Sequence, residues 1–231
     1  MGRLKRVYYD NELSSIIELD ENQSRKLKTV LRAEQGDNIE VLTHDYLALG
    51  EIHLSGKKSI QVRILEKRPI VRNTYTLKVY QCITKREYMD FMVEKYSELG
   101  VTHLIPVVSA RSFENIKPNA MERYNLIAKE AAMQCEREEL MTILPSVKLE
   151  RIKDDSDIKI LFHERMGEKS LPNVTSNNIS MIIGPEGGFT EKEYNFLVES
   201  GFKAYTPINP ILKAETAAVL FAGMVRLSIN G

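Results

Sequence analysis

The spacing of apolar residues divides the chain into two blocks. Between residues 59 and 64 apolar and polar residues alternate, which is typical of a strand with one buried face. From residue 21 to residue 32 the period changes to that of a helix. Three apolar residues share one face of this helix: Leu27, Val30 and Leu31. We therefore predict a small domain over residues 1–70, built from short strands around one helix and resembling a compact β-barrel.

From residue 71 onward, strand-like apolar runs alternate with helical stripes. The predicted strands cover residues 77–83, 101–108, 157–162 and 179–183, and helices begin near Met89, Pro118, Thr190 and Glu215. Such alternation is typical of a mostly parallel sheet covered by helices. We therefore predict an α/β domain over residues 71–231, with the boundary where the apolar pattern lapses at residues 66–69.

Two helix boundaries and one whole helix carry further signals. Thr190 is followed by Glu193 at the spacing of a capping box, and Gly100 occupies a position that closes a helix. The last predicted helix, residues 215–228, is apolar on nearly every side. A helix without a polar face is buried on more than one side. A second copy of the chain is a natural way to cover it.

The composition limits the class of protein. The 32 basic and 32 acidic residues cancel, so RNA binding would require local basic patches. No apolar stretch approaches the roughly 18–20 residues of a membrane span, and the first ten residues lack the apolar core of a signal peptide. The two cysteines are too few for a disulfide framework, and neither they nor the histidines have ligand-like spacing. We expect a cytoplasmic protein without membrane contacts and without a metal.

The segment most informative for chemistry is the glycine-rich run from Ile183 to Thr190. It leaves a predicted strand and enters the capped helix, so it lies at the carboxyl end of a strand, where α/β folds bind ligands. Glycines there let the backbone approach a ligand closely, although a tight turn without a ligand fits the run equally well. Neither a P-loop nor a Gly-x-Gly-x-x-Gly motif is present, which disfavours a dinucleotide fold and a Rossmann-type methyltransferase.

A second segment, Pro207–Ala218, joins a strand end, an irregular loop and the start of the last helix. Together the two segments resemble the paired signature of SPOUT methyltransferases, specifically the RsmE family of 16S ribosomal RNA uridine-N3-methyltransferases. The likeness continues through residues 85–91, 95–101, 106–112 and 130–137. Residues 30–32, followed by Gly36-Asp37, resemble that family's PUA-like domain. The resemblance spans nearly the whole chain.

This resemblance implies an α/β fold whose mostly parallel sheet carries a SPOUT-type trefoil knot at its C-terminal side, preceded by a PUA-like β-barrel that docks RNA. It also implies a homodimer that methylates a uridine of 16S ribosomal RNA in the small subunit. The cofactor, S-adenosylmethionine, would lie in the knot against three loops. The matching cofactor-binding residues are Leu161, Phe162, His163, Ile183, Gly184, Pro185, Glu186, Gly187, Gly188, Ile208, Asn209, Ile211, Leu212 and Lys213.

The implied reaction needs a nucleophilic uracil N3, which carries a proton and therefore requires a base or well-placed cations. Three cations are catalytic candidates for holding the uracil oxygens: Arg86, Arg137 and Lys213. Glu215 either orients such a cation or accepts the proton. A salt bridge between Lys213 and Glu215 at the start of the last helix is an equally compatible interpretation. The family usually has arginine at the position of Lys213, and it has a glycine that residues 208–213 lack.

Basic residues of the first domain are candidates for RNA docking. Arg25, Lys28 and Arg32 share the predicted helix face opposite the apolar stripe, with no acidic residue among them. Three further candidates are Arg3, Arg6 and, in the second domain, Arg111. An ordinary solvated face is the alternative interpretation of the helix stripe.

Two other functions stay open. One is an RNA-binding ribosome-assembly factor that keeps the fold without catalysis, and the other is a SPOUT methyltransferase that acts on a different ribosomal or transfer RNA nucleotide. Cofactor binding distinguishes the first from an enzyme. We expect a Gly187→Val substitution to abolish that binding, because the added side chain would enter the space of the ligand.

Overall fold

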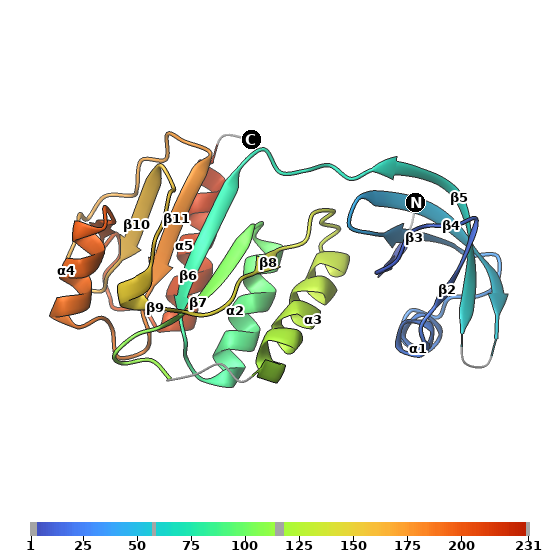
Figure 1. Ribbon diagram of the computed structural model, residues 1–231, viewed down its shortest axis with the longest axis horizontal. Helices are drawn as coiled ribbons and strands as arrows, with labels where there is room; N and C mark the ends of the chain where they lie inside the picture. Colours follow the sequence, from blue (N-terminus) through green and yellow to red (C-terminus); the bar gives the residue numbers. More distant parts are fainter. Residues whose placement is uncertain (1–3, 57–58, 114–117, 230–231) are drawn as a thin grey trace. The chain divides into compact units, whose positions relative to one another are not determined.

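The computed structural model describes residues 4–56, 59–113 and 118–229. Its contacts divide the chain into two compact units (Figure 1). The first unit contains the chain up to Arg72 together with Ala132–Glu139. The second unit contains Asn73–Ala131 and the chain from Leu140 onward.

The first unit is built on a five-stranded sheet with the order β1-β3-β4-β5-β2. Its elements are β1 (Lys5–Tyr8), β2 (Ile16–Leu19), α1 (Glu21–Thr29), β3 (Asn38–Leu42), β4 (Tyr46–Ser55) and β5 (Ile60–Pro69). The long β4–β5 pair contains two register shifts, and such bulges bend a strand. Figure 1 shows the resulting curvature. This bent sheet fits the β-barrel domain that the sequence predicts.

Helix α1 is shorter than the apolar pattern predicts. It begins after Asp20, whose side chain accepts a hydrogen bond from the main-chain N–H of Gln23, and it ends at Thr29. Leu27 is fully buried, but Val30 is 69% exposed. Arg32 lies beyond the helix with a positive φ of 49°. The predicted stripes are therefore wrong at these two positions: Val30, the C-cap residue, is exposed although its backbone is still helical, and Arg32 lies beyond the helix.

Ion pairs hold residues 132–139 within the first unit. The guanidinium of Arg68 binds the carboxylate of Glu138 through both of its terminal nitrogens, and Arg72 lies 3.4 Å from Glu139. Strand β5 continues through residues 66–69, where the apolar pattern lapses. The lapse in the pattern therefore does not coincide with the end of the strand.

The second unit contains a parallel sheet with the order β12-β10-β11-β6-β7-β8, to which β9 adds through β7. Its elements are β6 (Thr76–Cys82), α2 (Arg86–Glu98), β7 (His103–Val108), α3 (Pro118–Gln134), β8 (Thr142–Ile143), β9 (Val147–Lys148), the 3-10 helix η1 (Leu149–Arg151), β10 (Ile158–Phe162), β11 (Asn178–Ile183), α4 (Glu191–Glu199), β12 (Lys203–Tyr205) and α5 (Ala214–Ser228). The described strand pairs of this sheet are all parallel. The predicted α/β class is confirmed.

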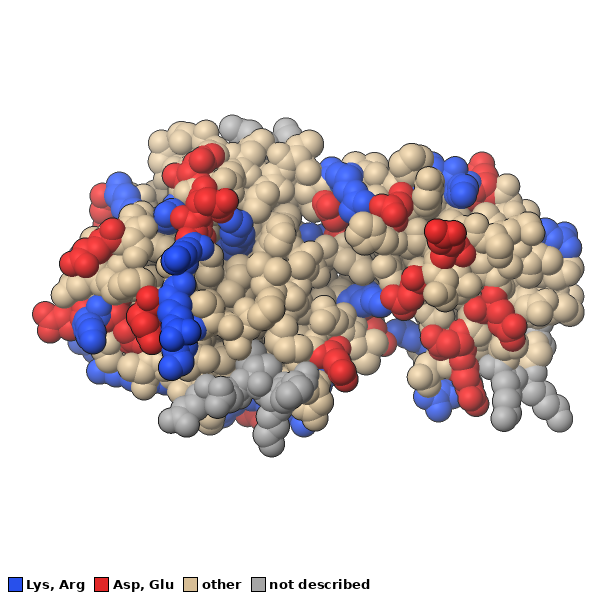
Figure 2. Space-filling model, viewed as in Figure 1, with Lys and Arg blue, Asp and Glu red and all other residues tan. Residues whose placement is uncertain are grey.

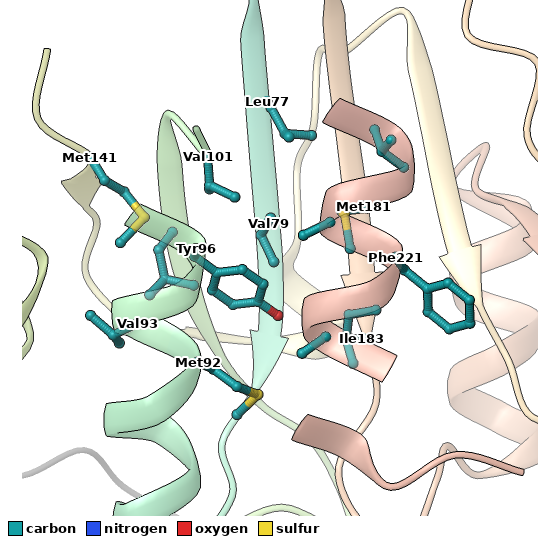
Figure 3. Close-up of a cluster of buried hydrophobic side chains, with 14 of the residues drawn as sticks. Leu77, Val79, Met92, Val93, Tyr96, Val101, Met141, Met181, Ile183 and Phe221 are labelled. Atoms are coloured by element: carbon teal, nitrogen blue, oxygen red, sulfur yellow. The ribbon is translucent and has the colours of Figure 1, made fainter. Parts of the chain in front are cut away.

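Successive strand residues face two different cores. On one face the sheet packs against α2, α3 and α5, and on the other it packs against η1 and α4. Figure 3 shows Met92 and Tyr96 of α2 beside Val79 of β6, with Phe221 of α5 near Ile183 of β11. The Tyr96 hydroxyl is buried and donates a 2.6 Å hydrogen bond to Oε1 of Gln81, so burial leaves this polar group satisfied.

Helix α5 is buried on one side only within the chain. Ala218, Phe221, Ala222 and Val225 are buried, whereas Leu227 is 89% exposed. The predicted burial on more than one side is therefore not met inside this unit, and the outer apolar residues face away from its core.

Candidate active site

A cavity of about 590 Å³ opens at the carboxyl edge of the sheet in the second unit. Its walls come from the loops that follow β10, β11 and β12 and from the starts of α2 and α5. Ligands of open α/β sheets bind at this edge, because the loops that leave the strands meet there. The strand order brings these three loops together, because β11 and β12 both pair with β10.

Most of the cofactor-binding residues that the sequence predicts lie on the wall of this cavity. They are Phe162, His163, Ile183, Gly184, Pro185, Glu186, Gly187, Gly188, Ile208, Ile211, Leu212 and Lys213. Leu161 and Asn209 are not part of the wall. Leu161 alternates with Phe162 along β10, so its side chain enters the core on the opposite face of the sheet. Pro210 lines the cavity in place of Asn209.

The glycine-rich run is anchored at its end by a double cap. The Thr190 hydroxyl accepts a hydrogen bond from the Glu193 N–H, and Glu193 Oε2 accepts one from the Thr190 N–H at 2.9 Å. The predicted capping box is thus confirmed. The other carboxylate oxygen of Glu193 accepts a 2.7 Å bond from the main chain of Ala110. The loop after β7 is therefore tied to the start of α4.

Arg111 braces the same run from outside. Its Nη1 donates a 2.8 Å hydrogen bond to the carbonyl oxygen of Gly187. A Cβ atom added to Gly187 would lie 3.3 Å from Cδ of Arg111, so that position faces the arginine. We predicted that the side chain of a valine at Gly187 would enter the ligand space. This reason is wrong, because the Cβ atom would point toward Arg111. Arg111 remains exposed beside this contact, and its assignment to RNA docking stays a prediction.

Gly188 is the glycine of the run whose replacement would disturb the cavity. Its φ is +67°, a conformation that L side chains rarely adopt. A Cβ atom there would lie 2.7 Å from Oε1 of Glu164, which also lines the cavity. The positive φ therefore favours glycine at this position, and a larger residue would also displace the Glu164 carboxylate from the cavity wall.

The start of α2 supplies two wall residues that the sequence analysis missed. Lys85, the residue that precedes α2, and Tyr88, in the first turn of α2, both line the cavity. The predicted catalytic residue Arg86 is instead 74% exposed and lies 3.8 Å from Asp90. Arg86 is therefore not part of the cavity wall. The sequence feature that could have identified them is Lys85-x-x-Tyr88, which closely follows a predicted strand.

The loops that follow β10, β11 and β12 add further wall residues that are not among the predicted cofactor-binding residues. They are Glu164, Arg165, Phe189, Thr206, Pro207 and Phe221, the last of these from α5. Phe162 and Phe221 stack with ring centroids 3.9 Å apart and an interplanar angle of 5°. The wall is thus partly aromatic and partly polar.

Two of the predicted catalytic residues meet at the start of α5. Lys213 and Glu215 both line the cavity. Among the ion pairs of the described chain none joins these two side chains, so the salt-bridge interpretation finds no support. Arg137 belongs to the first unit, where its carbonyl oxygen accepts a 3.4 Å bond from Arg6, and it is not a wall residue. The catalytic candidates that the cavity brings together are therefore Lys213 and Glu215.

His163 is buried beside the cavity and is held by main-chain groups. Its Nδ1 accepts hydrogen bonds from the N–H groups of Arg165 and Met166, each at 3.1 Å. Burial lowers the pKa of this imidazole, and the charge of Arg165 lowers it further, whereas Glu164 opposes the shift. The neutral ring is thus favoured.

The predicted RNA-docking residues of the first unit are dispersed. Arg6 pairs with Glu40 at 2.7 Å, Arg25 donates to Asn22, and Lys28 donates to the carbonyl oxygen of Gly56. Arg3 lies outside the described residues. Figure 2 shows basic and acidic side chains intermingled on the visible face of this unit. The visible face shows no continuous basic field.

The described residues contain neither a cluster of metal-ligating side chains nor a membrane-spanning helix. Within residues 4–56, 59–113 and 118–229, no group of three or more metal-ligating side chains comes together. In the same residues, no helix is both long enough and apolar enough to cross a membrane.

Comparison with known families decides the relationship of the chain. The sequence model of the RNA methyltransferase domain matches residues 71–226, which is most of the chain. The chain belongs to this family. A curated relative is the ribosomal RNA small subunit methyltransferase E of Aquifex aeolicus, which is 28% identical over 92% of this chain and 95% of the relative.

Two solved members of this kind share the whole fold. A methyltransferase of Legionella pneumophila with bound S-adenosylmethionine has a TM-score of 0.89 and 25% identity over 98% of both chains. The ribosomal RNA small subunit methyltransferase E of Neisseria gonorrhoeae, also bound to S-adenosylmethionine, has a TM-score of 0.83 and 26% identity over 95% of both chains.

Proposed function

We propose that this chain is an enzyme that transfers a methyl group from S-adenosylmethionine to N3 of a uridine in the 16S RNA of the small ribosomal subunit. The observation that carries the proposal is the cavity formed by the three sheet-edge loops in a member of the RNA methyltransferase family. Support comes from relatives named for small-subunit ribosomal RNA methylation and from similar structures solved with the cofactor.

The residues around the cavity fit S-adenosylmethionine in size and in chemistry. About 590 Å³ lies within the range of cofactor-sized pockets. The apolar wall, including Phe162, Ile183 and Leu212, suits the adenine ring. Three side chains of each sign also line it, the basic Lys85, Arg165 and Lys213 and the acidic Glu164, Glu186 and Glu215. Both signs are needed, because the ligand carries a carboxylate, an ammonium group and a sulfonium.

The bound cofactor supplies a methyl group that is already activated by its sulfonium. The residues of the chain have to make uracil N3 nucleophilic. We assign Lys213, with Lys85, to the uracil oxygens, where an ammonium group stabilises the negative charge that develops as N3 loses its proton. We assign the Glu215 carboxylate to the acceptance of that proton. Lys213 and Glu215, both at the start of α5, thereby act on the same uracil base.

We also propose that the C-terminal segment forms the trefoil knot of the SPOUT fold. Support comes from the close passage of the chain after β10 over β12. The N–H of Glu168 donates to Ala204, and the N–H of Thr206 donates back to Glu168. A Cβ atom on Gly167 would lie 2.6 Å from the main-chain nitrogen of Tyr205, so only glycine permits this approach.

We propose further that the enzyme is a cytoplasmic homodimer and that its first unit docks RNA. The exposed Leu220 and Leu227 on the outer side of α5 support the dimer, because a second copy of the same helix would cover them. Arg25 and Lys28 on α1 support docking, although Arg32 no longer shares their helix. The cytoplasmic assignment follows from the ribosomal substrate.

The experiment offers methyl-labelled S-adenosylmethionine and small ribosomal subunits from cells that lack this methyltransferase. Label at N3 of one 16S uridine is the expected result. Label on another nucleotide, or on transfer RNA offered in parallel, would replace the proposed target. Cofactor binding in calorimetry without label on any RNA would instead identify an RNA-binding factor, and the proposal of an enzyme would fail.

A further inference from the structure

One buried histidine contacts all three loops that build the cavity, through its main chain and through its ring. The main chain of His163, in the loop after β10, donates to Tyr205 of β12 at 3.0 Å and accepts a 2.9 Å bond from the Thr206 hydroxyl. The centroid of its ring lies 6.4 Å from that of Phe189 in the glycine-rich run and 5.3 Å from that of Tyr194, whose ring is nearly perpendicular to it. Phe189 and Thr206 are themselves wall residues. The residue therefore connects the three loops, and no step of the proposed methyl transfer is assigned to it.

The ring organises its own loop by accepting hydrogen bonds. Nδ1 receives the main-chain N–H groups two and three residues ahead, those of Arg165 and Met166. A nitrogen can accept them only while its lone pair is free, so Nδ1 carries no proton and Nε2 carries one. Protonation of Nδ1 would set a third N–H against the two that now point at it, and the turn at residues 163–166 would open.

The charged and titratable groups around the ring are few. Glu164 and Arg165 flank it in its own loop, with Oε2 of Glu164 3.6 Å from Nδ1, and Tyr194 faces it from α4. The pKa of His163 is lowered, first by burial and then by Arg165, against the opposing charge of Glu164. A lowered pKa means that the ordered loop binds a proton less readily than the open one. Order is therefore complete above pH ~6.5 and is lost as the pH falls below that value.

We propose that His163 is a positioning residue of the cavity, whose unprotonated Nδ1 gathers two main-chain N–H groups and so fixes the wall against which the cofactor lies. The part of this proposal that concerns S-adenosylmethionine rests on the proposed function. The part that concerns the loop does not, and the two are tested separately.

The first experiment uses the free protein. Nitrogen NMR at pH 7.5 should show His163 with an unprotonated Nδ1 and a protonated Nε2, and the amides of Arg165 and Met166 should exchange slowly. As the pH falls to 5.5, both amides should lose protection together with protonation of the ring, while the core amides of β11 keep theirs. A proton on Nδ1 at pH 7.5, or amides that stay protected after protonation, would overturn the proposal whether or not any cofactor binds.

The second experiment titrates S-adenosylmethionine between pH 7.5 and 5.5. The dissociation constant should rise about fivefold or more, and at most about tenfold per pH unit for a single proton. In His163→Asn the amide oxygen can accept the same two N–H groups, as in an Asx turn, without titrating. This variant should keep tight binding at pH 7.5 and lose the pH dependence.

Two further variants complete the design. His163→Leu lacks the acceptor and should bind weakly at every pH. His103→Gln changes a histidine at the start of β7, outside the cavity wall, and should keep the pH dependence of the parent. A pH dependence that persists in His163→Asn would assign it to another group and overturn the positioning role. Absence of binding by the parent at any pH would instead defeat the proposed cofactor.

Discussion

Two helices of the second unit begin at the same edge of the sheet in opposite ways. Helix α4 begins after Thr190, whose capping box satisfies the main-chain N–H groups of the first turn. Helix α5 begins after Lys213, which has no side-chain capping bond. An unfilled N-cap costs about 1 kcal/mol. The uncapped start borders the cavity, where its N–H groups and positive helix end are available to a ligand.

The same contrast separates α1 from α2. Asp20 caps α1 in the first unit, whereas α2 begins after Lys85 without a side-chain cap, and Lys85 lines the cavity. Among these four helices, side-chain caps thus precede α1 and α4, and an uncapped lysine that lines the cavity precedes α2 and α5. The difference indicates that stability is given up locally where the chemistry needs open donors and cations.

The strongest way to break this comparison is Lys213→Asp. Aspartate is a favoured N-cap residue and is also favourable at a helix N-terminus, so folding should gain up to about 1 kcal/mol. The same change reverses the charge that we assign to the uracil oxygens, and methylation should fall at least about 100-fold. Thermal unfolding and a methyl-transfer assay on the same preparation measure both effects.

Arg86→Ala is the matched control at the other lysine-led helix. Arg86 is exposed and lies outside the cavity wall, so methyl transfer should stay within about threefold of the parent. A Lys213→Asp enzyme that remains active would show that α5 begins with lysine for some reason other than the reaction.

The second prediction concerns the capped start. Glu193→Ala removes the acceptor of the Thr190 N–H together with the acceptor of the Ala110 N–H. The free energy of unfolding should fall by about 1–2 kcal/mol, a midpoint shift of roughly 2–8 °C for a chain of this size. Cofactor affinity should fall much less than stability. Calorimetric unfolding and a binding titration measure the two losses. For a residue of the cavity wall, affinity would fall more than stability.

The smallest effect is expected for Asp20→Ala. The change removes one exposed cap from α1 and should cost about 0.5–1 kcal/mol of stability in the first unit. Asp20 and the cavity lie in different units, so cofactor affinity should be unchanged. A measurable loss of affinity would contradict the division between structural and functional helix starts.

Local signals in the sequence predicted the second unit better than the first. The capping box at Thr190 and the helix stop at Gly100 are encoded within a few residues, and both are found. The second half of β5 could not be predicted, because residues 65–69 are all exposed and carry no alternation. Its pairing with β4 defines it as a strand, and that pairing is not a local property.

The residues of the candidate site also divide into those that local sequence predicts and those that depend on contacts distant in sequence. The glycine-rich run was predicted from its own composition, but Lys85 and Tyr88 depend on which strand lies next to β11. That neighbour is β6, and the strand order cannot be derived from hydrophobic spacing. The placement of Arg137 in the first unit likewise depends on contacts such as Arg68 with Glu138, which are 70 residues apart.

The central claim is that the cavity beside the glycine-rich run binds S-adenosylmethionine, and two matched glycine substitutions test it most directly. Gly188 and Gly201 both have a positive φ, of 67° and 91°, so alanine introduces similar backbone strain of about 1 kcal/mol at each. An added Cβ meets the Glu164 carboxylate at 2.7 Å in the first case and only an ordinary 3.8 Å contact in the second.

The measurement is the dissociation constant of S-adenosylmethionine for the parent, Gly188→Ala and Gly201→Ala by calorimetry at pH 7.5. We expect one site per chain in the parent, affinity weakened at least about tenfold in Gly188→Ala, a change of about 1.4 kcal/mol, and unchanged affinity in Gly201→Ala. Equal affinity for all three proteins, or no binding by the parent, would contradict it.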